Sequence, residues 1–346
     1  MTRPDLTIRG GGIFGLSIAW EAARRGARVR LIEAARIGAG SSGGVVGALA
    51  PHVPENWNEK KAFQLDSLLM AEGFWSGVTG ASGLPTGYAR LGRLQPLDSA
   101  EALARATERG AEAQSLWQAQ AQWQVVPATG AAWEPHSPTG MLIHDTLSAR
   151  LHPRMAATAL VGAIRAKGGE VVIGEAEATG PVIWATGHVG LLALNEDLGR
   201  KVGAGVKGQA LLLAYDASTL PQMQVDGLHI VPHADGTVAI GSTSENQWDD
   251  PLSVDAQCDA LLIRAVAAVP ALRGSRVLER WAGIRPRARS RAPMLGPWPG
   301  RTGEFMANGG FKIGFGMAPK VAQVMVDLVL DGVDHVPEGF RVEASL

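Results

Sequence analysis

The sequence predicts an α/β protein in which a mostly parallel sheet is interleaved along the chain with a second, antiparallel sheet. Both ends of the chain alternate apolar strand-like runs with helical patterns, which is typical of a parallel sheet. Residues 205–245 instead hold several short strand-like runs separated by turn residues, the pattern of an antiparallel sheet. A length of 346 residues exceeds one ordinary core, and 46% apolar residues can build two.

The chain begins with a predicted strand, helix and second strand. Residues 5–10 indicate the first strand, and Leu16, Ala19, Trp20 and Ala23 then recur at helical spacing. Gly26 is placed to end that helix, and residues 27–33 indicate the second strand. This order is the β-α-β unit, which pairs its two strands in parallel.

The remaining elements follow from the same patterns. Helices are expected over 59–78, 99–122, 153–168 and near 254–268. Strands are expected in "KGGEVVI", "PVIWATG", "GVKGQALLLAY", "GLHIVPH" and "GTVAIGST". The stretch "PKVAQVMVDLVLDG" predicts a last helix, with Pro319 in its first turn and Gly332 just past its end.

A glycine motif lies between the first strand and the first helix. Gly10, Gly12 and Gly15 form G-x-G-x-x-G, which allows a tight turn, a close approach of a pyrophosphate and close packing of the helix on the strand. The helix N-terminus then offers unpaired N–H groups to the phosphates. Glu33, at the end of the second strand, can accept hydrogen bonds from a ribose. The motif, in this context, predicts a Rossmann-like domain that binds a dinucleotide. Arg9 is unusual in such a strand, and it either reaches the cofactor or a partner edge or turns outward.

Composition excludes several other classes. The formal net charge of −1 argues against nucleic acid as a partner. The only cysteine, Cys258, leaves no internal disulfide and no cysteine-based zinc site, and we expect no bound metal. No apolar run reaches the length of about 18 residues that a membrane span needs, and the residues before the glycines hold no apolar core of signal-peptide length, so we expect no signal peptide there. We therefore expect a cytoplasmic protein.

A second glycine-rich loop selects the dinucleotide. Residues 38–47 contain five glycines and the hydroxyl residues Ser41 and Ser42. A plain NAD domain has no need of this loop, whereas FAD extends its pyrophosphate and ribityl chain past the first contact. At this point the sequence resembles the family of FAD-dependent oxidoreductases that includes D-amino-acid oxidase, glycine oxidase and sarcosine oxidase. The resemblance also rests on "GVKGQALLL", "HIVPHADGTVAIGST", "WAGIRPRARSRAPMLGP" and "NGGFKIGFGMAPKVA" and covers nearly the whole chain.

The resemblance implies a discontinuous architecture. It implies a Rossmann-like FAD-binding domain from residues 1–75, 145–200 and 281–346, and an interleaved antiparallel-sheet substrate domain from 76–144 and 201–280. FAD would be held without a covalent bond, since no cysteine lies near the segment that some relatives use for attachment. The residues implied to bind FAD are Gly10, Gly12, Ile13, Phe14, Gly15, Glu33, Ala34, Ser41, Ser42, Gly47, Ala48, Leu49, Ala185, Thr186, Gly187, Gly310, Phe311, Lys312, Ile313 and Gly314.

The resemblance also implies the reaction. A small amine or amino acid that carries a carboxylate, of the glycine, sarcosine or D-amino acid type, would be oxidised to an imine, and O2 or another acceptor would reoxidise the flavin. Arg285 matches the carboxylate-binding arginine of the family, and Lys312 matches a second basic position. His229 and His52 are candidates to face the substrate and the flavin. A helix that starts at Pro319 would direct its positive end at the flavin.

The sequence departs from the family at two places. Relatives carry a small β-meander between the strands "EVVI" and "PVIWATG", and here an eight-residue connection leaves no room for it. A partner subunit, in a homo-oligomer or a hetero-oligomer, or local helices would then cover this side. The arginines in "RPRARSRAP" would share one face if the segment were extended, and could hold a second anion, or they belong to a solvated loop.

Three other readings stay open. A stretch after the second glycine loop is also similar to a flavin domain that removes a carboxymethyl group from a tRNA wobble uridine amine, and the arginine run would then meet RNA. The chain could instead be a flavin-binding subunit of a larger dehydrogenase complex, without an activity of its own. An NAD dehydrogenase is disfavoured by the second glycine loop. Neither the substrate's handedness nor its chain length follows from the sequence.

Overall fold

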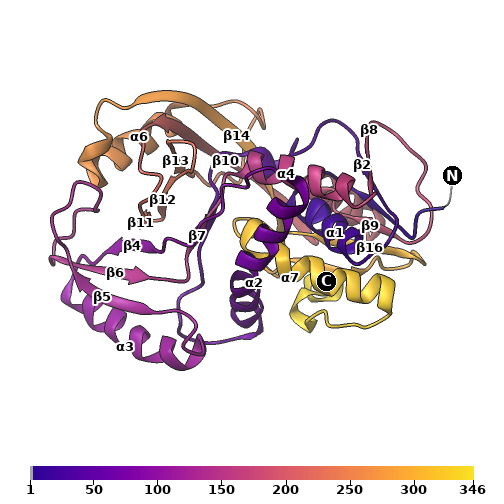
Figure 1. Cartoon of the computed structure of the whole chain (residues 1–346), viewed down its shortest axis with the longest axis horizontal. Helices are drawn as coiled ribbons and strands as arrows, with labels where there is room; N and C mark the ends of the chain where they lie inside the picture. Colours follow the sequence, from indigo (N-terminus) through magenta and orange to yellow (C-terminus); the bar gives the residue numbers. More distant parts are fainter. Residues whose placement is uncertain (1–2) are drawn as a thin grey trace.

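The computed structural model describes residues 3–346 and places two sheets side by side in an elongated molecule. Figure 1 shows the sheet that holds the N-terminal strands at one end, the sheet with α3 and α6 at the other, and helices α2, α4 and α7 towards the middle and the first end. The chain crosses between the two parts several times, as the alternating patterns predict.

The first sheet is six-stranded, in the order β15-β16-β9-β1-β2-β8. Five of its strands run in parallel, and only β15 pairs antiparallel, with β16. Its strands are β1 (Leu6–Arg9), β2 (Val29–Glu33), β8 (Glu170–Ile173), β9 (Val182–Trp184), β15 (Met294–Pro297) and β16 (Glu304–Asn308). The helices that pack together over it are α1 (Ile13–Arg24), α2 (Glu59–Ser82), α4 (Pro153–Ala166) and α7 (Gly314–Val326).

The second sheet is eight-stranded, in the order β14-β10-β13-β12-β11-β4-β6-β5. All neighbours in it are antiparallel except β11 and β4. Its strands are β4 (Arg93–Pro96), β5 (Trp123–Pro127), β6 (Met141–Asp145), β10 (Gly203–Ala214), β11 (Gln222–Val225), β12 (Leu228–Pro232), β13 (Thr237–Gly241) and β14 (Arg276–Ala288). Helix α3 (Ala100–Leu116) packs on β5, α6 (Ala256–Ala268) packs on β10, and α5 (Gly187–Asp197) packs on β10 and β14.

Short elements complete the chain. A two-stranded sheet joins β3 (Ala48–Leu49) to β7 (Ala149–Arg150), and a 3-10 turn spans Ser41–Gly43 in the second glycine loop. A turn of π-helix, Asp327–Asp331, extends α7 and ends at Gly332, whose left-handed φ of 70° fits a glycine. Further 3-10 turns are Pro270–Leu272, Glu338–Phe340 and Val342–Ser345.

The buried apolar residues form one large core and smaller ones. The large core lies among α1, α2, α4, α7 and the first sheet, where it includes the fully buried Leu6 and Ile8, and it continues to α3 and β5 through Trp117 and Trp123. A second core lies between α6 and the eight-stranded sheet. Cys258 is buried in that second core, so the prediction that it is a packing residue is confirmed.

The predicted helices and strands are confirmed, with changed ends. Helix α2 continues to Ser82, and α3 stops at Leu116 rather than at 122. The last helix begins at Gly314, so the prediction that Pro319 lies in its first turn is wrong. Pro319 lies inside α7, where it supplies no N–H, and the next N–H, of Lys320, donates to the hydroxyl of Ser67 on α2 (3.2 Å). Packing against α2 therefore replaces part of the hydrogen bonding that the proline removes.

The short connection between β8 and β9 contains no strand. It is attached to the first strand by Thr7, whose hydroxyl donates to the carbonyl of Thr179 (2.8 Å) and accepts from its N–H (3.1 Å). The side chain of Ile173, at the end of β8, is 51% exposed. The divisions that the resemblance implies at 75/76 and 280/281 fall inside α2 and β14. No helix in the described residues is long and apolar enough to cross a bilayer.

Candidate active site

The glycine motif brings three segments of backbone into contact. Gly10 has a φ of 108°, and a side chain there would lie 2.4 Å from the carbonyl oxygen of Ala185. A side chain on Gly15 would lie 2.0 Å from the carbonyl oxygen of Gly10. Only glycine allows β1, α1 and the end of β9 to approach this closely. The backbone at the start of α1 is therefore left open to a cavity.

The second glycine loop and the acidic residue support this turn. Ser42 accepts a hydrogen bond from the N–H of Ile13 (2.9 Å), which caps α1 from outside because Gly12 has no side chain to do so. Glu33 accepts from the N–H of Gly11 (2.6 Å) and of Ala35 (2.9 Å). Each carboxylate oxygen keeps a lone pair for a further donor.

A cavity of about 730 Å³, here called the cofactor cavity, runs along this backbone. The lining residues that the sequence predicts are Gly10, Gly12, Ile13, Phe14, Glu33, Ala34, Ser41, Ser42, Ala185, Thr186, Gly187, Gly310, Phe311 and Gly314. Residues from both ends of the chain thus meet around one elongated space.

Three residues assigned to FAD by resemblance line neither this cavity nor the one described below. Gly15 packs against Gly10, as shown above. A side chain on Gly47 would lie 1.9 Å from the carbonyl oxygen of Leu151, and Leu49 is fully buried in β3. Gly15 and Gly47 each pack against a backbone carbonyl, and Leu49 packs in the core.

Further residues line the cofactor cavity, among them Arg9, for which the sequence left open whether it reaches the cofactor or a partner edge or turns outward. Arg9 and Trp184 line the cofactor cavity, and the Arg9 guanidinium lies 5.2 Å from the centre of the Trp184 indole and donates to the carbonyl of Ala176 (3.2 Å). The signal was present, because a charged residue at the end of a parallel strand is unusual. Asn308 and His188 also line it, and no sequence pattern indicated them.

The donors and acceptors of the cofactor cavity fit FAD. Thr186 Oγ1 and His188 Nδ1 are buried there without a hydrogen-bond partner, and the start of α1 carries no acidic side chain that would compete with a phosphate. Glu33 suits ribose hydroxyls. When bound, FAD supplies the flavin ring that accepts a hydride.

A second cavity, of about 440 Å³ and here called the substrate cavity, adjoins the first. The two share Ile13, Ser41, Ser42, Phe311 and Gly314 as lining residues. The predicted site residues that line it are Arg285, Lys312, His229, His52, Ala48 and Ile313. All four residues predicted to contact the substrate or the flavin ring therefore meet in one space.

Arg285 reaches this cavity from β14 and lies across the neighbouring strand. A side chain on Gly208 of β10 would lie 1.9 Å from Arg285 Nη2 and 2.2 Å from its Cζ. The guanidinium donates to Ser242 Oγ (2.6 Å) and to the carbonyl of Thr243 (3.2 Å). Burial lowers the pKa of Arg285 to about 10, and the charge of Glu245 opposes this effect. Arg285 therefore stays cationic at pH 7.

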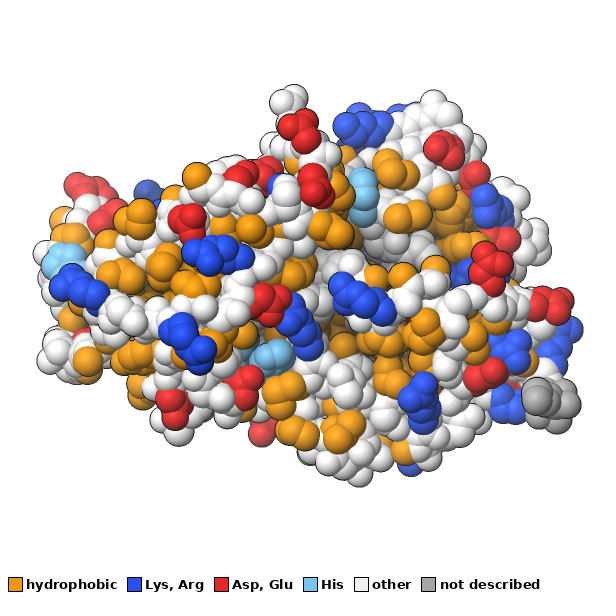
Figure 2. Space-filling model, turned by 90° about the horizontal axis from the view of Figure 1, so that it is seen from above, with side chains coloured by type: hydrophobic (Ala, Val, Ile, Leu, Met, Phe, Trp, Pro, Cys, Tyr) orange, Lys and Arg blue, Asp and Glu red, His pale blue; other side chains and the backbone are white. Residues whose placement is uncertain are grey.

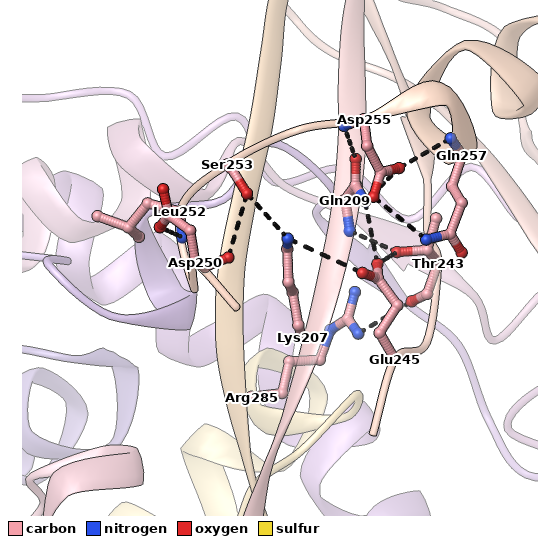
Figure 3. A network of polar contacts seen from close by, with 10 residues as sticks. All are labelled: Lys207, Gln209, Thr243, Glu245, Asp250, Leu252, Ser253, Asp255, Gln257 and Arg285. Carbon is pink, nitrogen blue, oxygen red and sulfur yellow. Dashed lines mark hydrogen bonds and ion pairs between the residues drawn. The ribbon is translucent and has the colours of Figure 1, made fainter. Parts of the chain in front are cut away.

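A polar network surrounds Arg285 and keeps its counter-charge at a distance (Figure 3). Glu245 lies 3.9 Å from the ammonium group of Lys207 and accepts from Gln209 (3.2 Å). Gln209 also donates to Asp255 (2.9 Å), the residue that caps α6. Because Glu245 is paired with Lys207, the charge of Arg285 remains available to a ligand.

Lys312 is held beside Arg285 by the backbone. The N–H of Phe311 donates to the carbonyl of Pro286 (3.0 Å), and Gly310 forms a β-bridge with Arg287. The pKa of Lys312 is lowered, first by burial among the cavity walls and then by the charge of Arg285.

The two histidines line the substrate cavity from different elements, since His229 lies on β12 and His52 follows β3. His229 is half-buried, and its pKa falls to about 4 because of burial and the charges of Arg93, Lys312 and Arg285. His52 is fixed by Gln64, which accepts from its backbone N–H (2.7 Å) and contacts its Nδ1. Burial also lowers the pKa of His52. Both rings are therefore neutral at pH 7.

The arginine run does not form one cationic face. Only Arg285 and Arg287 belong to β14; Arg287 lies 5.6 Å from the ring centre of Phe311 and donates to Asn246. Arg289 donates to the last carbonyl of the chain, and Arg291 lies in a turn with a φ of 61°. The face seen in Figure 2 likewise mixes charges of both signs.

The helix aimed at the cavities begins earlier than expected. Helix α7 starts at Gly314, which lines both cavities, and its first residue has no side-chain cap. The positive end of the α7 dipole thus lies at the junction of the two cavities. This end is five residues before Pro319, where the sequence predicted it.

The comparisons with known proteins agree with this geometry. Residues 5–328 match the family described as FAD dependent oxidoreductase (DAO). Glycine oxidase of Pseudomonas putida KT2440 is 27% identical over 368 aligned residues, covering 97% of this chain and 98% of that protein. A putative thiamine biosynthesis oxidoreductase, ThiO, of Rhizobium etli is 30% identical, covering 92% of this chain and 94% of that protein.

Solved structures share the fold at lower identity. Glycine oxidase from Geobacillus kaustophilus superposes with a TM-score of 0.82 at 22% identity, covering 99% of both chains. Iminodiacetate oxidase from Chelativorans sp. BNC1 has a TM-score of 0.84 at 19% identity, covering 97% of this chain and 98% of that one. With the matched family spanning almost the whole sequence, this chain belongs to the FAD-dependent oxidoreductases of the DAO family.

Proposed function

We propose that this protein oxidises a small amine bearing a carboxylate to the corresponding imine, with O2 or another acceptor taking the electrons from the reduced flavin. The observation that carries the proposal is the pair Arg285 and Lys312 in a cavity that adjoins the cofactor cavity. No aspartate or glutamate lines the substrate cavity in the part of the chain that the structure describes. The cavity therefore favours an anionic ligand.

The residues would act by binding and orientation. Arg285 offers two N–H groups to a carboxylate, and Lys312 adds a second positive charge. The substrate would lose a hydride from the carbon that carries the nitrogen and a proton from the nitrogen itself. His229 and His52 are neutral and could hold that proton, although water can also take it. Water then hydrolyses the imine to an oxo acid and an amine or ammonia.

The relatives support this choice of chemistry. Glycine oxidases of three further species match this chain, in addition to that of Pseudomonas putida. Their names indicate amine oxidation, and the two cations explain why an amine with a carboxylate would bind. We infer that the FAD is bound without a covalent link, because Cys258 is buried in the core of the other sheet.

The test is an anaerobic panel of glycine, sarcosine, D-amino acids and L-amino acids, with reduction of the flavin followed by bleaching of its visible absorption. We expect at least one to bleach the flavin, and Arg285→Ala to need a concentration at least ten-fold higher. Denaturation should release yellow FAD into the supernatant. A wild-type protein that retains FAD but is bleached by none of these amines would refute the proposal. Equal bleaching of Arg285→Ala would refute the role of Arg285.

A further inference from the structure

The wall of the substrate cavity that belongs to the eight-stranded sheet is polar. Arg93 and Gln95 of β4, Gln224 of β11 and His229 of β12 all line the cavity, and we call these four residues the polar floor. The register pairs Gln224 with His229 across β11 and β12, so the two side chains share one face. Arg93 joins that face, since it donates to Gln224 (2.8 Å).

The opposite face of the same strands is apolar. Met223 and Ile230, which alternate with the floor residues, are fully buried in the core against α6. An antiparallel sheet with one face in the core commonly carries polar side chains on its other face, and here that face lines the substrate cavity. The four polar side chains are therefore available to a ligand with polar groups.

The polar floor offers hydrogen-bond donors from Arg93, Gln95 and Gln224, and the neutral ring of His229 donates from one of its two nitrogens. Arg93 is nearly fully buried; it donates to Asp145 (2.9 Å) and to the amide oxygen of Gln224, which leaves the amide nitrogen of Gln224 as a donor. Gln95 Nε2 and His229 Nδ1 are buried without any hydrogen-bond partner. Unpaired buried polar atoms are costly, so a group that accepts hydrogen bonds would be stabilised here.

The charges favour an acceptor that is an anion. Asp145 compensates Arg93, and Lys207 is paired with Glu245, which leaves Arg285 and Lys312 as two positive charges in the substrate cavity. One carboxylate balances only one of them. The charges of Arg93, Lys312 and Arg285 all lower the pKa of His229, and these four residues line the same cavity.

We propose that the amine substrate carries a second carboxylate, which binds the polar floor while the first binds Arg285. This inference rests on the proposed function and narrows its substrate to a dicarboxylic amine. Glycine and sarcosine would leave the floor unpaired, and so would bind more weakly. The second carboxylate can be attached to the nitrogen or to the side chain, and the test separates these two cases.

The first test measures binding without turnover. Succinate and glutarate are titrated into the FAD-loaded protein alongside acetate and propionate, and binding is followed by the change in the visible spectrum of the flavin. We expect the dicarboxylates to bind at least ten-fold more tightly. Gln95→Met should remove most of that advantage and leave acetate within two-fold, and Gln95→Glu should weaken the dicarboxylates further. Gln124→Met, on an exposed position of β5, is the matched control and should change nothing.

The second test measures reduction of the flavin under anaerobic conditions. Iminodiacetate is compared with sarcosine, and D- and L-aspartate with D- and L-alanine, which distinguishes a carboxylate on nitrogen from one on the side chain. Equal half-saturation by the one-carboxylate and two-carboxylate partners of each pair overturns the inference, as does equal binding in the first test. If dicarboxylates bind tightly but no amine reduces the flavin, the proposed function is refuted, whereas the inference that the polar floor binds a carboxylate is supported.

Discussion

Replacing Gly208 with alanine is expected to displace the guanidinium of Arg285 without disturbing the fold. The new methyl group would lie 1.9 Å from Nη2 and 2.2 Å from both Cζ and Nη1 of that arginine. Ordinary contacts between such atoms are about 3.5 Å, so the guanidinium has to move by about 1.5 Å. Gly208 does not have a left-handed φ, so alanine fits its backbone.

The size of the effect follows from the hydrogen bonds that the displaced group loses. Charge-assisted hydrogen bonds contribute about 1.5–3 kcal/mol, which corresponds to a loss of about 10-fold to about 150-fold in affinity for a carboxylate. The melting temperature should change little, because the methyl group meets the far end of a flexible side chain rather than backbone.

The assay is a spectral titration of the FAD-loaded protein with acetate, for Gly208→Ala, Arg285→Ala and the double variant. If Gly208 acts through Arg285, the double variant should bind no more weakly than Arg285→Ala alone, since the two changes remove one interaction. Two results would show that the Arg285 guanidinium does not bind the carboxylate from its place beside Gly208. One is a loss of affinity in the double variant equal to the sum of the two single losses, and the other is an affinity of Gly208→Ala within two-fold of wild type.

Three further changes test other parts of the structure. Gly15→Ala should prevent FAD binding and lower the melting temperature, because the new methyl group would meet the backbone carbonyl of Gly10, which cannot move aside. The control is Gly80→Ala, which has open space around it and should keep full flavin absorption. Asp145→Asn should lower the free energy of unfolding by about 3–5 kcal/mol in a urea titration, because it leaves the buried Arg93 uncompensated, and a loss below about 1 kcal/mol would contradict this. His233 is fully buried, and its pKa falls to about 3, mainly through burial. As the pH drops, the histidine is therefore protonated in the unfolded chain before it is protonated in the folded protein. The free energy of unfolding should therefore fall between pH 6.5 and pH 3, by up to ~1.4 kcal/mol per pH unit, and His233→Asn should reduce that slope; parallel slopes for the two proteins would oppose this assignment.

Local patterns predicted the elements of this protein better than they predicted its contacts. The β-α-β unit, Glu33 and the second glycine loop are all visible in consecutive residues, and the structure places them around one cavity. The four residues that the resemblance assigned to the substrate side also line one cavity. Gly47 is different, because its need for glycine comes from the carbonyl of Leu151, about a hundred positions away.

The polar floor illustrates what a single sequence leaves hidden. Gln95 and Gln224 lie in short strands, and each would pass as an ordinary polar residue on an exposed face. Their meeting depends on the parallel pairing of β4 with β11, which joins segments about 130 residues apart. The start of α7 was misplaced for a related reason, because proline usually marks the first turn of a helix, and only the packing of α2 allows it further in.

The interleaving of the two sheets brings Arg285 and Lys312 to the wall of one cavity. Two cations repel each other, so neither side chain would stay beside the other unless the backbone enforced it. The enforcement is local to the end of β14, where Pro286 and Arg287 pair with the loop that precedes α7. That loop follows β16 of the first sheet, whereas β14 belongs to the second sheet. A chain that completed one sheet before it began the other would need a separate interface to bring these two positive charges together, whereas here 26 intervening residues and two backbone contacts suffice.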